Sequence, residues 1–257
     1  MSPNSYWTSF ATILRREVRR FTRIWPQTLV PPVITMSLYF VIFGSLIGSR
    51  IGEMGGYSYM EFVVPGLIMM AVITNSYANV VSSFYSAKFQ RNVEELLVSP
   101  TPNWVIMAGY VLGGVARGLI VGLIVTLIAL FFTSLKMQHV GITIAIVFLT
   151  AVLFSLAGFI NAIFANSFDD ISIIPTFVLT PLTYLGGVFY SIELLSPFWQ
   201  GLSKLNPILY MVNAFRYGVL GVSDISVFWA FAGVLLFIAL LFAWGLHLMT
   251  HGKRLRH

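Results

Sequence analysis

The sequence predicts an all-α membrane protein with six transmembrane helices. Of its 257 residues, 58% are hydrophobic and only 9% are charged, whereas an ordinary globular domain has about 25% charged residues. A soluble chain of this length lacks the polar side chains needed to cover so apolar a core. A bilayer removes this difficulty, because each helical crossing takes about 20 predominantly apolar residues. We therefore interpret 1–257 as a single transmembrane domain.

The positions of the basic residues indicate topology rather than nucleic-acid binding. The formal net charge is +6, and eight of the fifteen Lys and Arg lie in two clusters, Arg15 to Arg23 and Lys253 to Arg256. A nucleic-acid groove requires basic residues interleaved with aromatic ones on a folded surface, so we expect no nucleic-acid partner. The chain has no cysteine, which excludes disulfides, thiol catalysis and cysteine-ligated metals.

Residues 5–24 have the pattern of an amphipathic helix. Apolar side chains recur every three or four residues, from Trp7 through Leu14 to Phe21, and arginines occupy the other side. A basic amphipathic helix directly before a spanning segment is typical of an interfacial helix whose arginines face anionic lipid headgroups. A helix that binds a soluble partner is the alternative.

Continuous apolar runs give the six spans. They are predicted at 27–48, 59–85, 104–133, 141–165, 171–190 and 226–249. The third run is too long for one upright crossing, so its first turns are expected to tilt or to lie at the interface. A tight acidic turn over 166–170 separates the fourth run from the fifth, which contains Pro175 and Pro181.

The stretch 191–224 decides the number of spans. It is fairly apolar, yet it contains four charged residues and two prolines, Pro197 and Pro207. A seventh crossing here would place the two basic termini on opposite sides. Six crossings place both termini in the cytoplasm together with the loop 86–103, and ten of the fifteen Lys and Arg then lie on that side, as the positive-inside rule requires. We therefore expect 191–224 to form a broken re-entrant hairpin on the outer side.

Signatures of enzymes are missing from the sequence. No lysine follows a phosphate-loop glycine pattern, so the chain is not expected to bind ATP itself. His247 and His251 lie four residues apart on a predicted helix, a spacing that could ligate a metal. Without a nearby carboxylate or cysteine, interfacial histidines are the preferred interpretation. We expect no catalytic residue, no metal site and no cofactor in this chain.

The second span has a polar face. Four residues at steps of four, three and four share this face: Asn75, Asn79, Ser82 and Ser86. A primary amide that faces lipid leaves donors and acceptors unpaired at a cost of some kcal/mol. The face is therefore expected either to line a substrate pathway or to make interhelical hydrogen bonds, worth about 0.6 kcal/mol each.

The third span has two glycine registers and one arginine. The registers are Gly109 with Gly113, and Gly114 with Gly118 and Gly122. Glycines at this spacing allow helices to approach closely, either within one subunit or between two copies. Arg117 interrupts the span and either extends its side chain towards the cytoplasmic interface or forms a buried ion pair.

The loop 86–103 contains a short amphipathic segment. Its apolar residues Phe89, Val93, Leu96 and Leu97 fall on one helical face. Its charged residues are Lys88, Arg91, Glu94 and Glu95, and Pro100 ends the segment. A short cytoplasmic helix of this kind is suited to a groove in a partner protein, and a turn on the membrane surface is the alternative.

Three sequence blocks resemble those of a known family. The first is FVVPG at 62–66; the second is KFQRNVEELLVSP at 88–100, with the pair Gly109-Tyr110 after it; the third contains GGVFY at 186–190, LNP at 205–207 and FRYG at 215–218. In order and spacing they resemble the membrane subunits of ABC transporters of the ABC-2 type, the exporter class that includes polysaccharide and daunorubicin-resistance permeases. The likeness is greatest to bacterial inner-membrane permeases.

This resemblance implies a half-transporter. Two copies of the chain would join two separate ATP-binding subunits, which would hold the ATP and Mg²⁺. It implies that 88–99 is a coupling helix that contacts the ATPase, that 5–24 is the connecting helix, and that 186–223 caps the outer mouth. The implied contact residues are Lys88, Arg91, Glu94, Glu95, Leu96 and Leu97.

The expected function is therefore that of the permease subunit of an ATP-driven exporter in the bacterial inner membrane. A stand-alone channel or an ion-coupled carrier is the alternative. The predicted spans hold few acidic residues for a proton or sodium relay, which argues against that alternative. A glycan, a lipid or a drug remains possible as the substrate.

Overall fold

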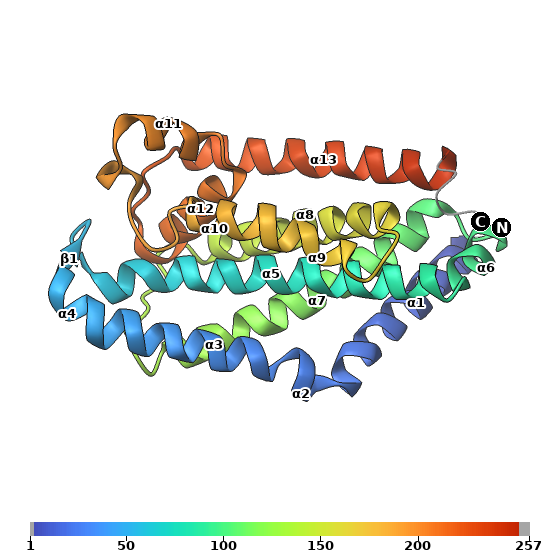
Figure 1. The fold of residues 1–257 in the computed structure, drawn as a ribbon, viewed down its shortest axis with the longest axis horizontal. Coiled ribbons are helices and arrows are strands. Elements are labelled where there is room, and N and C mark those ends of the chain that lie inside the picture. The colour runs from blue at the N-terminus through green and yellow to red at the C-terminus, as the bar shows by residue number, and fades with distance from the viewer. Residues whose placement is uncertain (1–2, 252–257) are drawn as a thin grey trace.

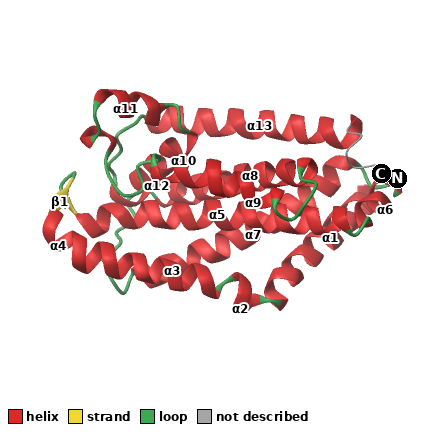
Figure 2. Ribbon diagram, in the orientation of Figure 1, coloured by secondary structure: helices red, strands yellow, loops and turns green. Residues whose placement is uncertain are grey.

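The structure is a computed structural model that describes residues 3–251. Helices make up almost all of it, and a two-stranded antiparallel ribbon of β1 (Glu53–Met54) and β2 (Tyr57–Ser58) connects two of them (Figure 2). The mostly helical fold that the sequence predicts is confirmed. The C-terminal basic cluster, Lys253 to Arg256, lies outside the described residues.

Within residues 3–251, five stretches of helix are long and apolar enough to cross a membrane: Trp25–Gly44, α5 (Tyr59–Phe89), α7 (Asn103–Ala129), α8 (Val140–Phe164) and α13 (Val227–His251). The first is built from α2 (Trp25–Thr28), α3 (Val30–Val41) and the start of the π-helical η1 (Ile42–Ile47), after which α4 (Gly48–Ile51) ends the segment. These five correspond to five of the six predicted spans, with ends that differ by a few residues.

Helix α5 forms the centre of the molecule (Figure 1). It packs against α7, α8 and α12 (Pro207–Leu220), and most of its side chains are buried. Its first turn is closed by a capping box, in which Ser58 Oγ accepts from the Glu61 amide at 3.3 Å and the Glu61 carboxylate accepts from the Ser58 amide at 3.0 Å. The centre of the bundle is therefore a helix with a fixed starting point.

The predicted glycine registers both serve packing inside the chain. A Cβ at Gly113 would lie 2.5 Å from the Glu17 Cβ of α1 (Pro3–Arg23), and one at Gly122 would lie 2.6 Å from Val72 of α5. One register thus faces α1 and the other faces α5. Helix α7 lies between these two helices at a separation that only glycine allows.

The remaining predicted span, 171–190, is a shorter and irregular helix. It consists of α9 (Asp170–Ile174), the π-helical η2 (Pro175–Leu179) and α10 (Thr180–Tyr184), which follow one another without a break. Pro175 begins the π-helical part, because a proline inside a helix removes one backbone donor and displaces the turn before it. The sixth crossing therefore stays a prediction.

The stretch 191–224 folds into short helices rather than one long helix. These are the 3₁₀ turn η3 (Ile192–Leu194), α11 (Pro197–Lys204) and α12. Pro197 and Pro207 begin the last two, as proline does at first helical positions. Helices α11 and α12 lie at one end of the long axis, and α6 (Asn92–Val98) and the start of α1 lie at the other (Figure 1).

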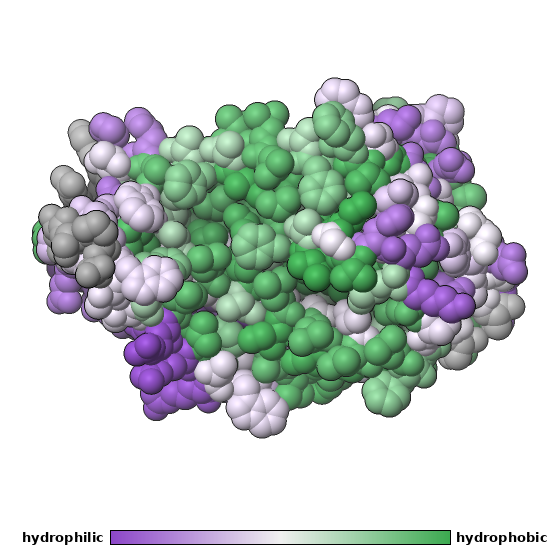
Figure 3. Space-filling view, turned by 180° about the vertical axis from the view of Figure 1, so that it is seen from behind, coloured by the Kyte–Doolittle hydropathy of each residue, from purple (hydrophilic) through white to green (hydrophobic). Residues whose placement is uncertain are grey.

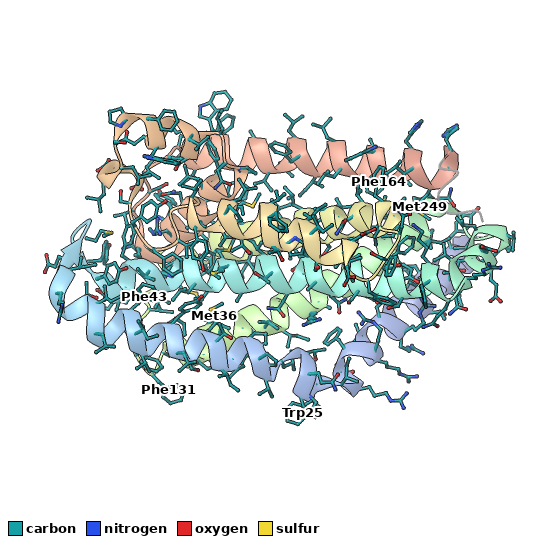
Figure 4. All side chains as sticks on the ribbon, in the orientation of Figure 1. Trp25, Met36, Phe43, Phe131, Phe164 and Met249 are labelled. Carbon is teal, nitrogen blue, oxygen red and sulfur yellow. The ribbon has the colours of Figure 1, made fainter. Side chains whose placement is uncertain are left out.

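Apolar side chains cover the middle of the molecule, and hydrophilic ones gather towards its two ends (Figure 3). Exposed aromatic residues lie at the edges of this apolar zone: Trp25, for example, is 56% exposed and points away from the body where α1 meets α2 (Figure 4). Such a distribution is that of a protein whose middle is surrounded by hydrocarbon, with interfacial aromatic residues near the headgroups.

Candidate functional site

The predicted coupling segment begins where α5 ends, and Lys88 fixes this junction. The Lys88 ammonium donates to the backbone oxygens of Ile163 at 2.7 Å and Ala165 at 2.8 Å, at the carboxyl end of α8. These carbonyls have no partner inside their own helix, and a cation there also interacts favourably with the helix dipole. Lys88 therefore holds α5 and α8 together and points into the chain rather than towards a partner.

Arg91 forms the corner between α5 and α6. Its backbone φ is 63°, which makes it the one non-glycine residue with positive φ in the described part of the chain. This conformation costs an L-residue roughly 1–2 kcal/mol. The strained corner turns the chain so that α6 leaves the axis of α5, and the Arg91 side chain is exposed.

Helix α6 has one buried side and one exposed side. Val93 is 1% exposed and packs in the core, and Leu96 and Leu97 are partly buried against it. On the other side, Glu95 is exposed and Val98 is 86% exposed. The predicted contact residues thus divide: Lys88, Leu96 and Leu97 contact this chain, whereas Arg91 and Glu95 are exposed. Val98, which was not among the predicted contacts, is exposed beside them.

Phe89 and Phe168 extend the exposed side of α6 with apolar surface. Phe89 is 65% exposed and Phe168 51% exposed, and their rings lie 5.2 Å apart. Phe168 also stacks edge-on against Tyr85 of α5 at 4.9 Å. We call the surface made of Phe89, Arg91, Glu95, Val98 and Phe168 the α6 face. It combines exposed aromatic and aliphatic residues with charges of both signs, as protein–protein interfaces do.

The predicted polar face of α5 makes hydrogen bonds inside the chain. Asn75 Oδ1 accepts from Arg117 at 3.1 Å, and Asn79 Oδ1 accepts from Arg20 of α1 at 2.9 Å. Ser82 Oγ donates to the Ala78 carbonyl of its own helix at 2.7 Å. Ser82 and Ser86 are half-buried, whereas Asn79 is wholly buried. The two amides thus hold α7 and α1 against α5.

The contacts of Arg117 differ from both arrangements expected from the sequence, extension to the cytoplasmic interface and a buried ion pair. It forms no ion pair among the described residues, since both ion pairs found there belong to Glu17. Its guanidinium instead donates to the Thr28 carbonyl at 3.2 Å and to Asn75. Arg117 therefore connects α7 to the bend between α1 and α3.

Glu17 is the site residue that sequence reasoning missed. It is 1% exposed, with Arg16 at 3.5 Å and Arg20 at 3.4 Å, and it accepts from Ser83 Oγ of α5 at 2.5 Å. Arg16 also donates to the Tyr110 hydroxyl of α7. The signal was present: Glu17 is a lone acidic residue among five arginines, three residues before one of them.

The buried line of α1 therefore differs from the predicted apolar stripe. Ile13, Glu17 and Phe21 face the bundle, whereas Trp7 is 70% exposed. The amphipathic helix itself is present, and Arg15, Arg19 and Arg23 are exposed on it. Helix α1 thus rests on the bundle along a side that contains a charge.

At the opposite end of the molecule, Arg216 joins segments distant in the sequence. It is 1% exposed, and it donates to the Phe62 carbonyl at 3.3 Å and to the Gly187 carbonyl at 2.7 Å. Its guanidinium also lies 3.8 Å from the centre of the Phe62 ring, a cation–π contact. The first and third sequence blocks are therefore one structural unit, held by a buried arginine.

The two histidines of α13 stack on each other at 4.8 Å. Within residues 3–251 no group of three or more His, Asp or Glu is arranged to hold a metal ion. The pair is a feature of the helix end, close to the Asn103–Thr250 hydrogen bond of 3.4 Å that joins the start of α7 to α13.

Comparison with known proteins identifies the class to which this architecture belongs. The family model of the ABC-2 type transporter matches residues 8–220, which include most of α1, the α6 face and the Arg216 unit. The chain belongs to the ABC-2 type transporter family, whose members are the membrane subunits of ABC transporters.

Among individual proteins, the chain is 62% identical to the inner membrane transport permease YadH of Escherichia coli K12, over 98% of both chains. It is 22% identical to nodulation protein J of Neorhizobium galegae, over 85% of this chain and 84% of that protein. The resemblance to ABC-2 permeases of the bacterial inner membrane, inferred from the three sequence blocks, is confirmed.

Proposed function

We propose that this chain is the membrane-spanning subunit of an ATP-driven exporter in the bacterial inner membrane. Two copies would form the translocation pathway and would bind two separate ATP-binding subunits, which carry ATP and Mg²⁺. Both termini and α6 would be cytoplasmic, 171–190 would be the remaining crossing, and 191–224 would be a re-entrant cap on the outer side. The family membership and the name of the Escherichia coli relative support the transport role and the location.

The α6 face is the observation that carries this proposal. A monomeric membrane protein has little reason to keep Val98 at 86% exposed and Phe89 at 65% exposed at the charged end of the molecule. Exposed apolar residues rimmed by charges mark a docking surface. An ATP-binding subunit in the cytoplasm is the partner that the family implies.

The contacts of α6 explain how a movement there would reach the membrane. Val93 seats α6 in the core, and Lys88 ties the end of α5 to the end of α8. Helix α1 would move with α5, because Glu17 of α1 accepts a hydrogen bond from Ser83 of α5. ATP-driven closure of the two ATPases would therefore move α6, α5 and α1 as one body, by the hinge and shear motions of packed helices.

The pathway wall of Asn75, Asn79, Ser82 and Ser86 stays a prediction. Within one chain Asn79 is covered by Arg20. A substrate could reach this amide only after α1 moves away from α5, so the pathway face would be exposed in one of the two transport states and closed in the other.

The test is a charge reversal on α6. The double variant Glu94→Lys and Glu95→Lys should lose co-purification with the ATP-binding subunit while it still inserts into the membrane, because both residues lie on the accessible part of α6. Glu53→Lys and Glu193→Lys make the same change at the opposite end of the molecule and should leave the complex intact. Full complex formation and transport by the α6 variant would refute the assignment of α6.

A further inference from the structure

A cleft of about 430 Å³ lies between α12 and α13, at the end of the molecule opposite α6. This volume is in the range of small-molecule sites, about 300–1,000 Å³. Its lining consists of Lys204, Leu205, Pro207, Tyr210, Met211, Trp229, Ala230, Gly233, Val234 and Phe237. These residues come from the end of α11, the first turns of α12 and the first half of α13.

The chemistry of the lining is that of an amphiphile site with a cationic end. Lys204 is the one charged residue in the lining, and the rest is apolar or aromatic apart from the Tyr210 hydroxyl. That hydroxyl donates to the Lys204 carbonyl at 2.7 Å, which fixes the end of α11 to α12. Neither ion pair of the described residues includes Lys204, so a negative charge from outside the chain would complement it.

The cleft opens onto surface that faces lipid. Only 11% of the apolar window of α13 is buried, and Leu236 and Leu240 are more than half exposed. Trp229, at the start of α13, is 66% exposed, as an aromatic residue at headgroup depth would be. From Trp229 to Phe237 the helix rises about 12 Å, so the cleft runs from the headgroup level into the hydrocarbon.

We propose that this cleft binds one anionic phospholipid, with the phosphate at Lys204 and an acyl chain along α13. A phospholipid suits the cleft, because its charged headgroup would lie at Lys204 and an acyl chain would lie along the apolar part of the lining. A single acyl chain fits the volume, and the lysine supplies the preference for negative charge. The site requires only that the chain lies in a bilayer and does not depend on the transport role.

Gly233 offers a way to fill the cleft without disturbing the fold. It lines the cleft, and a Cβ at this position would meet no atom within 4 Å. Gly201 of α11 is equally open but does not line the cleft. Gly233→Leu is therefore a blocking variant, and Gly201→Leu is its matched control.

The experiment is native mass spectrometry of the purified full-length chain with palmitoyl-oleoyl phosphatidylglycerol or phosphatidylcholine. The wild type should bind phosphatidylglycerol more tightly than phosphatidylcholine. Lys204→Gln should weaken phosphatidylglycerol binding about fivefold, the effect of one lysine near a charged lipid surface, and leave phosphatidylcholine unchanged. Gly233→Leu should weaken both lipids, and Gly201→Leu neither.

A second measurement locates the lipid without any variant. Phosphatidylglycerol with a photoactivatable acyl chain should cross-link to residues 229–237 of the wild type. Cross-links confined to the arginines of α1 would overturn the proposal, as would Lys204→Gln and Gly233→Leu proteins that bind both lipids like the wild type. A Gly233→Leu protein that changes its oligomeric state and keeps its lipid would show a protein contact instead, and would also overturn it.

Discussion

At the scale of single residues, the structural role of Glu17 is not evident from its neighbours in the sequence. In the sequence it is one acidic residue among arginines, and in the structure it is a buried carboxylate between α1, α5 and α7. A buried charge is tolerated only where its hydrogen bonds are made. Arg20 and Ser83 donate to it here, and Arg16 adds an ion pair at 3.5 Å, so the packing of α1 depends on this one side chain.

Glu17→Gln should therefore destabilise the protein by about 1.5–3 kcal/mol, the range for a hydrogen bond to a charged group. The measurement is equilibrium unfolding in mixed detergent micelles. Combined with Ser83→Ala it should give a coupling energy of at least about 0.5 kcal/mol. Thr22→Ala, an exposed change on the same helix, is the control, and additive effects of the first two substitutions would contradict the network.

Asp170 gives the molecule a dependence on pH in the turn between α8 and α9. Its carboxylate accepts from the backbone amides of Asn166 at 2.8 Å and Ser167 at 3.2 Å, and from Ser167 Oγ at 2.8 Å. These bonds, the Asn166 amide first, hold the pKa of Asp170 below its usual value. Since the folded pKa is the lower one, the stabilisation is fully present above about pH 4. It is lost as the pH falls through the folded pKa.

Asp170→Asn should lower the Tm at neutral pH and remove this contribution to the loss of stability in acid. Thermal unfolding followed across the acidic range measures both effects. Asp169→Asn removes the same charge one residue earlier and should keep the acid dependence of the wild type. An Asp170→Asn protein with an unchanged pH profile would show that the turn does not depend on this carboxylate.

At the scale of elements, glycines allow two helix contacts that a larger residue would block. A Cβ at Gly66 of α5 would lie 2.5 Å from the Val188 carbonyl oxygen and 2.8 Å from the Val188 Cα. A Cβ at Gly158 of α8 would lie 2.6 Å from the Tyr77 carbonyl oxygen of α5. Both neighbours are backbone atoms, which cannot rotate away as a flexible side chain can.

Gly66→Ala should thus separate α5 from the segment after α10, at a cost of about 1–3 kcal/mol for overpacking. Because Arg216 bonds to Phe62 and Gly187 on either side of this contact, limited proteolysis should also cut the loop 185–191 faster. Gly201→Ala, where a Cβ meets no atom within 4 Å, is the control. Equal stability of the two variants would contradict the close approach.

Elements with a strong periodic pattern were predictable, and those shaped by local strain were not. Long apolar runs predicted the five long helices, because length and hydropathy alone decide a crossing. The prolines at 175 and 181 marked the irregular helix, but its π-helical turn depends on backbone geometry that no single residue specifies. The left-handed corner at Arg91 gave no signal, since glycine and asparagine are the usual residues there.

In the candidate site too, residues that follow helical periodicity were predictable, and contacts that depend on how the helices cross were not. Periodicity placed Asn75 and Asn79 on one face of α5, and the side-chain oxygen of each accepts a hydrogen bond from an arginine of another helix. Their partners, Arg117 and Arg20, could not be found from the sequence, because they depend on how α7 and α1 cross α5. The same holds for Lys88, whose charge predicted an exposed contact and whose length instead lets it reach the end of α8.

At the scale of the whole molecule, the two ends differ. The start of α1, helix α6 and the end of α13 lie at one end, and β1, α4 and α11 lie at the other (Figure 1). In the proposed orientation these ends face opposite sides of the membrane. The chain contains no cysteine, so single cysteines can report on each end separately.

Gln90→Cys, beside α6, and Glu53→Cys, in β1, are both exposed positions. In intact cells made permeable only at the outer membrane, an impermeant maleimide should label the second and not the first. In inverted inner-membrane vesicles the pattern should reverse. Labelling of both from the same side would refute the topology with α6 and the α1 start in the cytoplasm.

The irregular helix of α9, η2 and α10 has a mechanical consequence for the membrane itself. Its fifteen residues rise about 22 Å, whereas the hydrocarbon of a bilayer is about 30 Å thick. In the proposed crossing by this helix, such a hydrophobic mismatch can be relieved by thinning of the lipid beside it. Because Phe177 and Val178 of this helix are exposed, the lipid next to them should be thinner than elsewhere around the protein. A molecule crossing the bilayer on this flank would meet the shortest apolar barrier that the protein's surroundings offer.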